Sequence, residues 1–138
     1  MPYQPVSFDN AQVLRVPIVD GQILYLCTGV AVVNFGATDT NWRRDDLTFL
    51  VPDEGGASSL NVGTFEDSTV ILTPATIQSN DGSDEVGWGI DTADTVLDAN
   101  NTVRVTARTV VKGDPVVNIL RVAYQVNILG TPTHPPAD

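Results

Sequence analysis

Cysteine, lysine and histidine are nearly absent from this chain of 138 residues, which contains one of each. A single cysteine, Cys27, excludes a disulfide within the chain. One cysteine and one histidine also argue against a structural zinc site, which takes four ligands, and we expect no cofactor. His134 lies between Thr133 and Pro135, where we expect solvent rather than the rigid setting of a catalytic base. Cys27 lies in an apolar segment, where a buried thiol stays protonated and inert.

Basic side chains are also scarce, with 7 Lys and Arg against 17 Asp and Glu and a net charge of -10. This balance argues against nucleic acid and anionic membranes as partners, because both require neutralising Lys and Arg. The longest apolar stretch, Ile23–Phe35, is interrupted by polar residues and is too short to cross a bilayer as a helix. The N-terminal residues lack the features of a secretory signal, so we expect synthesis and folding in the cytosol.

Good helix formers are few, because most acids are Asp, while 11 Gly and 9 Pro favour turns. The sequence predicts an all-β fold: a single antiparallel β-sandwich or jelly-roll-like domain of about eight strands over residues 1–130. Residues 131–138 are predicted to form a proline-rich extended tail. The shorter strands are expected at residues 12–18, 47–51, 60–65, 69–77, 85–91 and, as a strand or one helical turn, 92–98. Pro74 predicts that the strand containing it is bulged or lies at a sheet edge.

The segment Thr102–Leu129 shows apolar residues at alternate positions on both sides of a turn at residues 112–115. A register that pairs Val111 with Val116 places apolar residues opposite apolar residues throughout. The sequence therefore predicts a long C-terminal hairpin in which Ala107 and Leu120 are directly opposed and buried.

The segment Gln22–Phe35 is apolar on both faces, which is typical of a strand in the centre of a sandwich or in a subunit contact. Asp20 and Gly21 predict a turn that joins it to residues 12–18. Gly29 is expected to mark a bulge or bend. Because both faces must be covered, we also expect self-association or ordering in a larger assembly.

Two clusters are candidate partner-binding residues, one of three arginines and one of a tryptophan with two arginines. In the predicted hairpin, Arg104, Arg108 and Arg121 share one outward face on a strongly acidic molecule, which suggests docking to an acidic partner or a second copy. Pairing with acidic loops of the same chain is the alternative. The second cluster is Trp42, Arg43 and Arg44, which is either a contact anchor or a loop that covers one end of the sandwich.

Trp88, between two glycines, is the candidate glycan-binding residue, since an exposed Trp can stack on a sugar ring. We favour the alternative that it packs in the core. The loop Asn80–Glu85 resembles a calcium loop in its acidic residues and its glycine, but a plain hairpin loop explains it better. Adjacent acid pairs such as Asp45 and Asp46 point to opposite faces of a strand and are expected to be solvated.

With no catalytic constellation in view, the sequence favours a non-enzymatic structural or assembly protein that contacts other protein subunits. The leading hypothesis is a virus or phage virion component, such as a decoration, capsid-associated or tail protein, made in the host cytoplasm. The alternative is a lectin-like carbohydrate-binding module that uses Trp88 or Trp42. A small glycosidase is a distant third.

Overall fold

The fold consists almost entirely of β-strands. A computed structural model describes residues 2–37, 41–79, 87–113 and 117–132. The described strands are β1 (Ser7–Pro17), β2 (Ile23–Ala37), β3 (Arg43–Leu50), β4 (Thr64–Ser79), β5 (Gly87–Leu97), β6 (Val103–Lys112) and β7 (Val117–Thr131). Two short 3-10 turns, η1 (Val19–Gly21) and η2 (Ala99–Asn101), follow β1 and β5.

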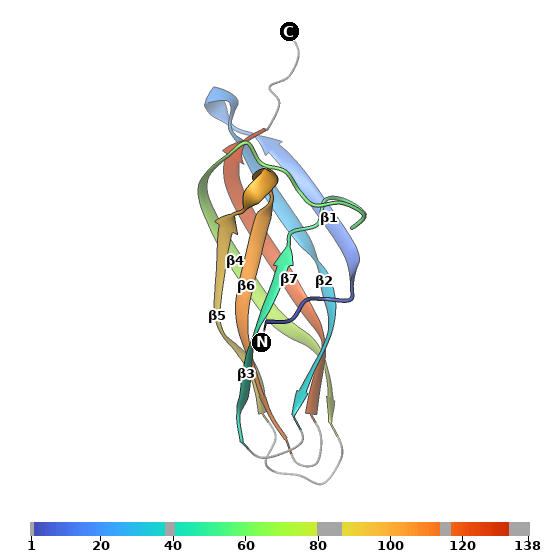
Figure 1. Cartoon of the computed structure of the whole chain (residues 1–138). Helices are drawn as coiled ribbons and strands as arrows, with labels where there is room; N and C mark the ends of the chain where they lie inside the picture. Colours follow the sequence, from blue (N-terminus) through green and yellow to red (C-terminus); the bar gives the residue numbers. More distant parts are fainter. Residues whose placement is uncertain (1, 38–40, 80–86, 114–116, 133–138) are drawn as a thin grey trace.

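The strands form two antiparallel sheets that face each other as a sandwich, with the order β1-β2-β7-β4 in one and β3-β6-β5 in the other (Figure 1). Strand β2 pairs with β7 and β3 pairs with β6, so chain-distant segments pair as in a long hairpin rolled around the core. This nesting is the strand order of a jelly roll with fewer strands than the usual eight. The predicted all-β sandwich or jelly-roll-like class is therefore confirmed, with seven described strands.

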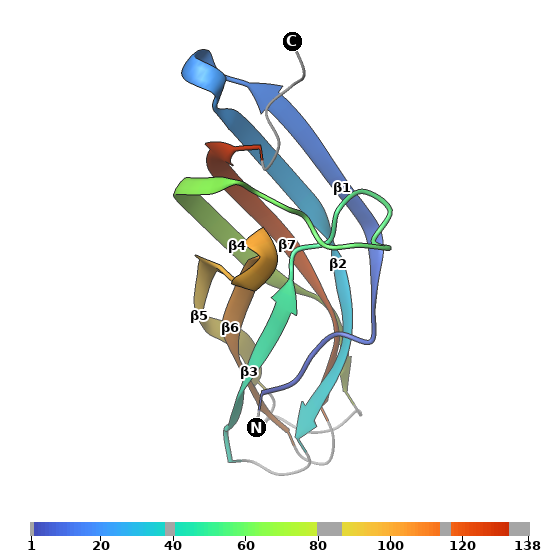
Figure 2. The same ribbon diagram turned by 45° about the horizontal axis from the view of Figure 1, so that its top comes forward.

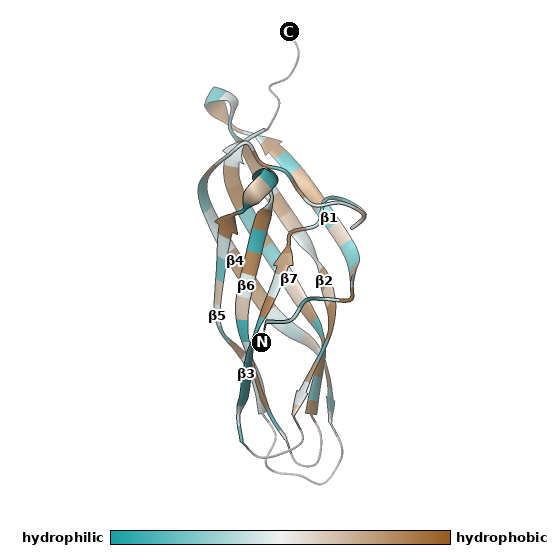
Figure 3. Ribbon diagram, in the orientation of Figure 1, coloured by the Kyte–Doolittle hydropathy of each residue, from teal (hydrophilic) through white to brown (hydrophobic). Residues whose placement is uncertain are grey.

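The core lies between the two sheets and is built by alternation along the strands. In β6, Val103, Val105, Ala107, Thr109 and Val111 point inward and are buried, and the change from hydrophobic to hydrophilic residues along this strand is visible in Figure 3. From the facing sheet, β2 and β7 contribute buried residues that include Tyr25, Phe35, Ile119, Tyr124 and Ile128.

The predicted C-terminal hairpin is wrong in its pairing, although both of its strands exist. Strands β6 and β7 belong to different sheets. Ala107 is buried but pairs with Leu47 and Ala93, and Leu120 is only half-buried. Alternation shows which face of a strand is buried but not which strand lies beside it. Stacked sheets are about 10 Å apart, a distance that four residues can span.

Two other local predictions are confirmed, the first hairpin and the edge position of the strand that contains Pro74. Strands β1 and β2 form the predicted hairpin, with Pro17 opposite Ile23, and Asp20 and Gly21 in the turn have φ of 63° and 76°. The turn projects beyond the neighbouring strand ends (Figures 1 and 2). Strand β4 is a sheet edge with register shifts around Pro74.

Strands β1, β3 and β4 begin earlier than predicted, at Ser7, Arg43 and Thr64 rather than at residues 12, 47 and 69. Residues 60–63 contain one isolated bridge, between Asn61 and Thr102, rather than a strand, and the two strands predicted at 85–91 and 92–98 are one strand, β5. Thr131, assigned to the tail, is the last residue of β7 and pairs with Thr64. The Asn80–Glu85 loop, His134 and the tail after Pro132 lie outside the described residues.

The N-terminal segment closes one side of the sandwich. Tyr3 forms a parallel bridge with Leu47 of β3, and its ring stacks on Phe35 of β2 at a centroid distance of 4.9 Å. Its hydroxyl hydrogen-bonds with Thr109 Oγ1 at 2.7 Å, and Thr109 in turn donates to the Asp45 carbonyl. Tyr3 therefore ties the two sheets together and satisfies a buried polar residue. Burial raises the pKa of Tyr3 to about 12.

Candidate functional site

The three arginines predicted to share one patch lie on two different sheets. Arg104 and Arg108 point outward from β6 in the three-stranded sheet, whereas Arg121 points outward from β7 in the four-stranded sheet. The single patch depended on the hairpin pairing and is therefore wrong.

Each of these arginines meets a carboxylate of its own chain. Arg104 Nε donates to Asp98 Oδ2 at 2.7 Å, and the hydrogen bond lowers the pKa of Asp98. Arg108 Nε lies 3.4 Å from Asp46 Oδ1, and Arg121 Nε lies 3.8 Å from Asp9 Oδ2. The first contact is well formed, and the other two are long pairs between largely exposed side chains.

The residues Trp42, Arg43 and Arg44 pack on the body of the domain at the start of β3. The Trp42 ring lies over Gly87, where a Cβ would come 2.7 Å from the ring, and Lys112 Nζ is 5.1 Å from the ring centroid. Arg43 stacks on Phe35 and donates to the Gly36 carbonyl at 2.7 Å. Arg44 lies 3.7 Å from Asp91. All three side chains thus have partners within the chain.

Trp88 is not packed in the core, contrary to the favoured interpretation. Its side chain is 47% exposed, although it lies opposite Val111 on the inward-facing row of β5. The inward alternation of β5 therefore does not bury the ring, and Trp88 stays available as a contact residue.

Cys27 is fully buried on the inner side of β2, and burial raises the pKa of its thiol from an ordinary value of 9.0 to about 12. The expected burial of Cys27 is confirmed, and the raised pKa favours the protonated thiol at neutral pH. Within the described residues, no three Cys, His, Asp or Glu side chains lie close enough together to hold a metal ion.

The surface that the sequence identified only in part is the outer face of the four-stranded sheet, defined as the side chains of β1, β2, β7 and β4 that point away from the core. Its cross-strand rows, in that strand order, are Val16, Leu24, Leu129 and Asp67; Leu14, Leu26, Asn127 and Thr69; Gln12, Thr28, Gln125 and Ile71; Asp9, Val30, Ala123 and Thr73; Ser7, Val32, Arg121 and Thr76. The doubly apolar pattern of residues 22–35 is the signal for this face.

One end of the outer face carries an aliphatic patch, formed by Leu14, Val16, Leu24, Leu26 and Leu129. Leu14 is 61% exposed and the other four are half-buried. At the adjoining hairpin tip, Val19 is 74% exposed. Covering neighbouring solvent-exposed aliphatic groups lowers the free energy, so the patch has the character of an interaction surface.

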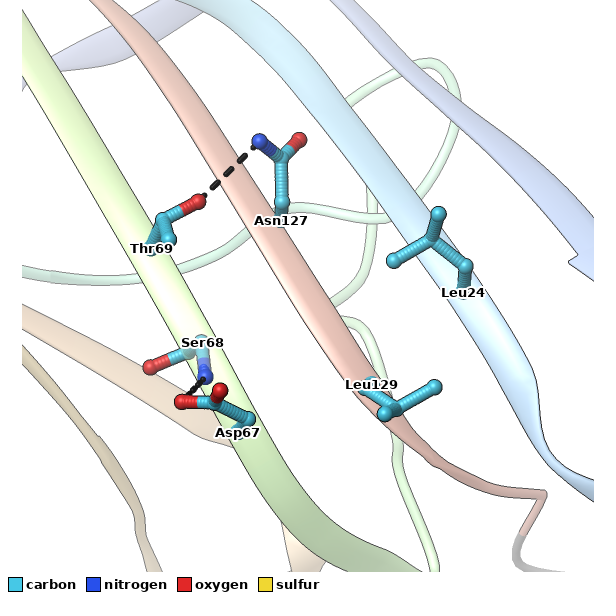
Figure 4. Close-up of a pocket in the computed structure, with 6 residues that line it drawn as sticks. All are labelled: Leu24, Asp67, Ser68, Thr69, Asn127 and Leu129. Atoms are coloured by element: carbon cyan, nitrogen blue, oxygen red, sulfur yellow. Dashed lines mark hydrogen bonds between the residues drawn. The ribbon is translucent and has the colours of Figure 1, made fainter.

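A shallow hollow of about 210 Å³ lies within this patch, lined by Leu24, Asp67, Ser68, Thr69, Asn127 and Leu129 (Figure 4). Asn127 Nδ2 donates to Thr69 Oγ1 at 3.1 Å, while Asp67 Oδ1 accepts from the Ser68 amide at 2.8 Å. No hydrogen-bond partner for Asn127 Oδ1 occurs in the described part of the chain. Small-molecule sites enclose about 300–1,000 Å³, so this open depression suits a protein side chain better than a metabolite.

The charged residues on the five rows of the outer face are Asp67, Asp9 and Arg121, and Glu54 lines a hollow beside Leu14, Leu26 and Thr28. Asp67 lies at the leucine-rich end, and Asp9 and Arg121 lie toward the opposite end. The three rows between them carry only aliphatic, Thr, Gln and Asn side chains, apart from Asp9 at the margin of the last row. On a chain of net charge -10, a second protein can cover the uncharged part of this face while burying few charges.

Comparison with models of protein families, with curated proteins and with solved structures found no match. No helix in the described ranges is long and apolar enough to span a membrane.

Proposed function

We propose that this chain is a non-enzymatic structural or assembly protein that binds another protein subunit through the outer face of the four-stranded sheet. The observation that carries the proposal is the aliphatic patch with uncharged rows beside it, on a molecule that is otherwise strongly acidic. Protein contacts commonly have this composition, with charged residues depleted at the centre and retained at the rim.

The assembly that we propose is a virus or phage particle, in which the chain acts as a decoration, capsid-associated or tail protein. The strand order supports this by fold-level analogy, because jelly rolls are common building blocks of viral capsids. Jelly rolls also form lectin domains, so the fold supports the assembly role only in combination with the outer face.

The proposal is tested by purifying particles from a source that carries the gene and quantifying the chain by mass spectrometry. We expect Leu14→Asp to be lost from the particles, because Leu14 is the most exposed member of the aliphatic patch and an aspartate there would be buried in the contact. Val96→Asp is the matched control, since Val96 is 49% exposed on the outer side of the other sheet. Equal incorporation of both variants, or absence of the wild-type chain from particles, would contradict the proposal.

A carbohydrate-binding module is the second candidate, and the exposure of Trp88 favours it. Trp88 follows Gly87 on β5 and is 47% exposed, so part of its ring can be approached from solvent. Aromatic rings bind sugars by stacking on the apolar face of the pyranose. A glycan array with wild type and Trp88→Ala tests this role, with Trp42→Ala as the control for a Trp that packs on Gly87 and Lys112. Glycan binding that disappears only in Trp88→Ala would favour the module over the assembly protein.

A further inference from the structure

Asp67 and Arg121 lie at equal distances on either side of the middle row of the outer face, whereas Asp9 lies one row from it. Gln12, Thr28, Gln125 and Ile71 form that row. Asp67 lies two rows away on one side and Arg121 two rows away on the other. Since adjacent rows on one face are two residues apart, or about 6.6 Å, each charge lies about 13 Å from the middle row.

A two-fold axis along the middle row therefore exchanges the acidic end with the basic end. Such an axis places Asp67 of one molecule opposite Thr76 of the other, one strand away from Arg121 of that second molecule. Neighbouring strands are about 4.8 Å apart, which an arginine side chain can cross. The same operation repeats the contact at the other end, as a closed two-fold dimer requires.

We propose that the outer face binds the outer face of a second copy of this chain, with Asp67 of each copy paired to Arg121 of the other. This inference rests on the proposed function and specifies its partner. The two sheets pack as aligned layers, in the way that two sheets pack inside a β-sandwich.

The residues of the middle row can pack against the same residues of the second copy. Along the axis, Thr28, Gln125 and Ile71 each meet their own counterpart, so no like charges are brought together. Ile71 is 59% exposed in the single chain and is covered in the dimer. On β2, Leu24 and Leu26 of one copy face Val32 and Val30 of the other, which pairs aliphatic groups across the interface. On β1 and β7, Leu14 faces Asp9 and Leu129 faces Arg121, so these two charged side chains lie against leucines of the second copy.

The face is close in size to one side of a standard protein contact. From Asp67 to Arg121 it measures about 26 Å along the strands, and its four strands span about 19 Å, which gives a flat footprint of about 500 Å². A layer of side chains exposes more surface than its flat footprint. The face therefore approaches the ~800 Å² that each partner contributes to a standard interface.

Arg121 has enough N–H donors to bind a second carboxylate. Its contact with Asp9 is long, at 3.8 Å, and the two side chains are 46% and 52% exposed. A guanidinium has five N–H donors, so Arg121 can lie between Asp9 of its own chain and Asp67 of the second copy. Among the residues that the structure describes, Asp67 has one hydrogen bond, from the Ser68 amide to Oδ1, and Oδ2 can accept a further one.

Charge reversal with trans-complementation tests this pairing. Sedimentation equilibrium gives the dimer dissociation constant of wild type, Asp67→Arg and Arg121→Asp. We expect each variant to dimerise about tenfold more weakly or worse, because each sets like charges against each other at both ends. An equimolar mixture of the two variants should dimerise like wild type, because both ends then pair Arg with Asp.

Arg108→Asp is the matched control, since it makes the same change of charge on the outer side of the other sheet. It should leave the dissociation constant unchanged. Because the mixture contains only the two single variants, its recovery also shows that each one folds. Wild-type protein that stays monomeric at all concentrations, or a mixture no tighter than the single variants, would overturn the inference.

These results are distinguishable from failure of the proposed function. If Leu14→Asp is lost from particles while the charge variants are retained and the chain is monomeric, the outer face binds a different subunit. The function then stands and the second copy is ruled out. If the dimer forms as described but the chain is absent from particles, the second copy stands and the particle role fails.

Discussion

Gly29 of β2 lies directly opposite Tyr124 of β7, and the tyrosine ring occupies the space that any larger residue at position 29 would need. A Cβ at position 29 would come 2.7 Å from Tyr124 Cζ. We therefore expect Gly29→Ala to lower the free energy of unfolding by about 1–3 kcal/mol through overpacking. Chemical denaturation measures this, and an unchanged midpoint would show that the ring can move aside.

Tyr124→Phe should change the free energy of unfolding in the opposite direction from Gly29→Ala. Tyr124 is 3% exposed, and its hydroxyl has no hydrogen-bond partner among the residues that the structure describes. A buried hydroxyl without a partner costs free energy that phenylalanine does not incur. We expect Tyr124→Phe to be equally stable or about 1 kcal/mol more stable in the same denaturation experiment. A loss of more than 1 kcal/mol would mean that the hydroxyl is bonded in solution.

The sequence predicted the strands better than their partners. Alternation in β6 and β7 indicated two long half-buried strands, and both exist, but a local pattern carries no information on which strand lies alongside. The assumed pairing of Ala107 with Leu120 then placed Arg121 beside Arg104 and Arg108. One topological error thus produced a patch that the structure does not contain.

The sequence indicated that the strand within residues 22–35 has an apolar outer side, but it did not show how far this face extends over neighbouring strands. Residues 22–35 are apolar on both sides, which correctly predicted a central strand with a second face to cover. The neighbours that complete the face, Leu14, Leu129 and Thr69, come from three other strands. Their juxtaposition depends on long-range register, which no short sequence window contains.

Ile119 and Leu120 form a matched pair for testing the phase of β7. The alternation was read with Leu120 inward, but Ile119 is fully buried and Leu120 half-buried, because the pairing is irregular between residues 119 and 121. We expect Ile119→Ala to cost about 2–5 kcal/mol and Leu120→Ala clearly less. Thermal and urea unfolding of the two variants decide this, and a larger loss for Leu120→Ala would contradict the described register.

Tyr3 should stabilise the domain from its N-terminal position through two separable contacts. Tyr3→Phe removes the hydrogen bond to Thr109 but retains the stacking on Phe35, so we expect a loss of about 0.5–1.5 kcal/mol. Tyr3→Ala removes both contacts and should cost about 3–5 kcal/mol, the usual range for a large aromatic side chain. If both variants unfold at the wild-type midpoint, the N-terminal segment does not close the sandwich in solution.

As pH rises, titration of Cys27 should lower the stability of the domain at a lower pH than titration of its tyrosines does. Its thiol has a pKa raised from 9.0 to about 12 by burial, whereas that of Tyr3 is raised from 10.0 to about 12. Because the folded pKa is the higher one, the contribution is fully present below the unfolded pKa. It is lost as pH rises from about 9 to about 12, at about 1.4 kcal/mol per pH unit.

The comparison of wild type with Cys27→Ala isolates this effect. Guanidinium unfolding at pH 8, 9, 10 and 11 should show wild type losing stability from pH 9, while the variant starts lower at pH 8 and stays level until about pH 10. The starting deficit reflects the small cavity left by the sulfur, and only the pH at which each curve begins to fall tests the thiol. Curves that fall from the same pH would show that Cys27 does not titrate with unfolding and that its burial has no effect on its proton affinity.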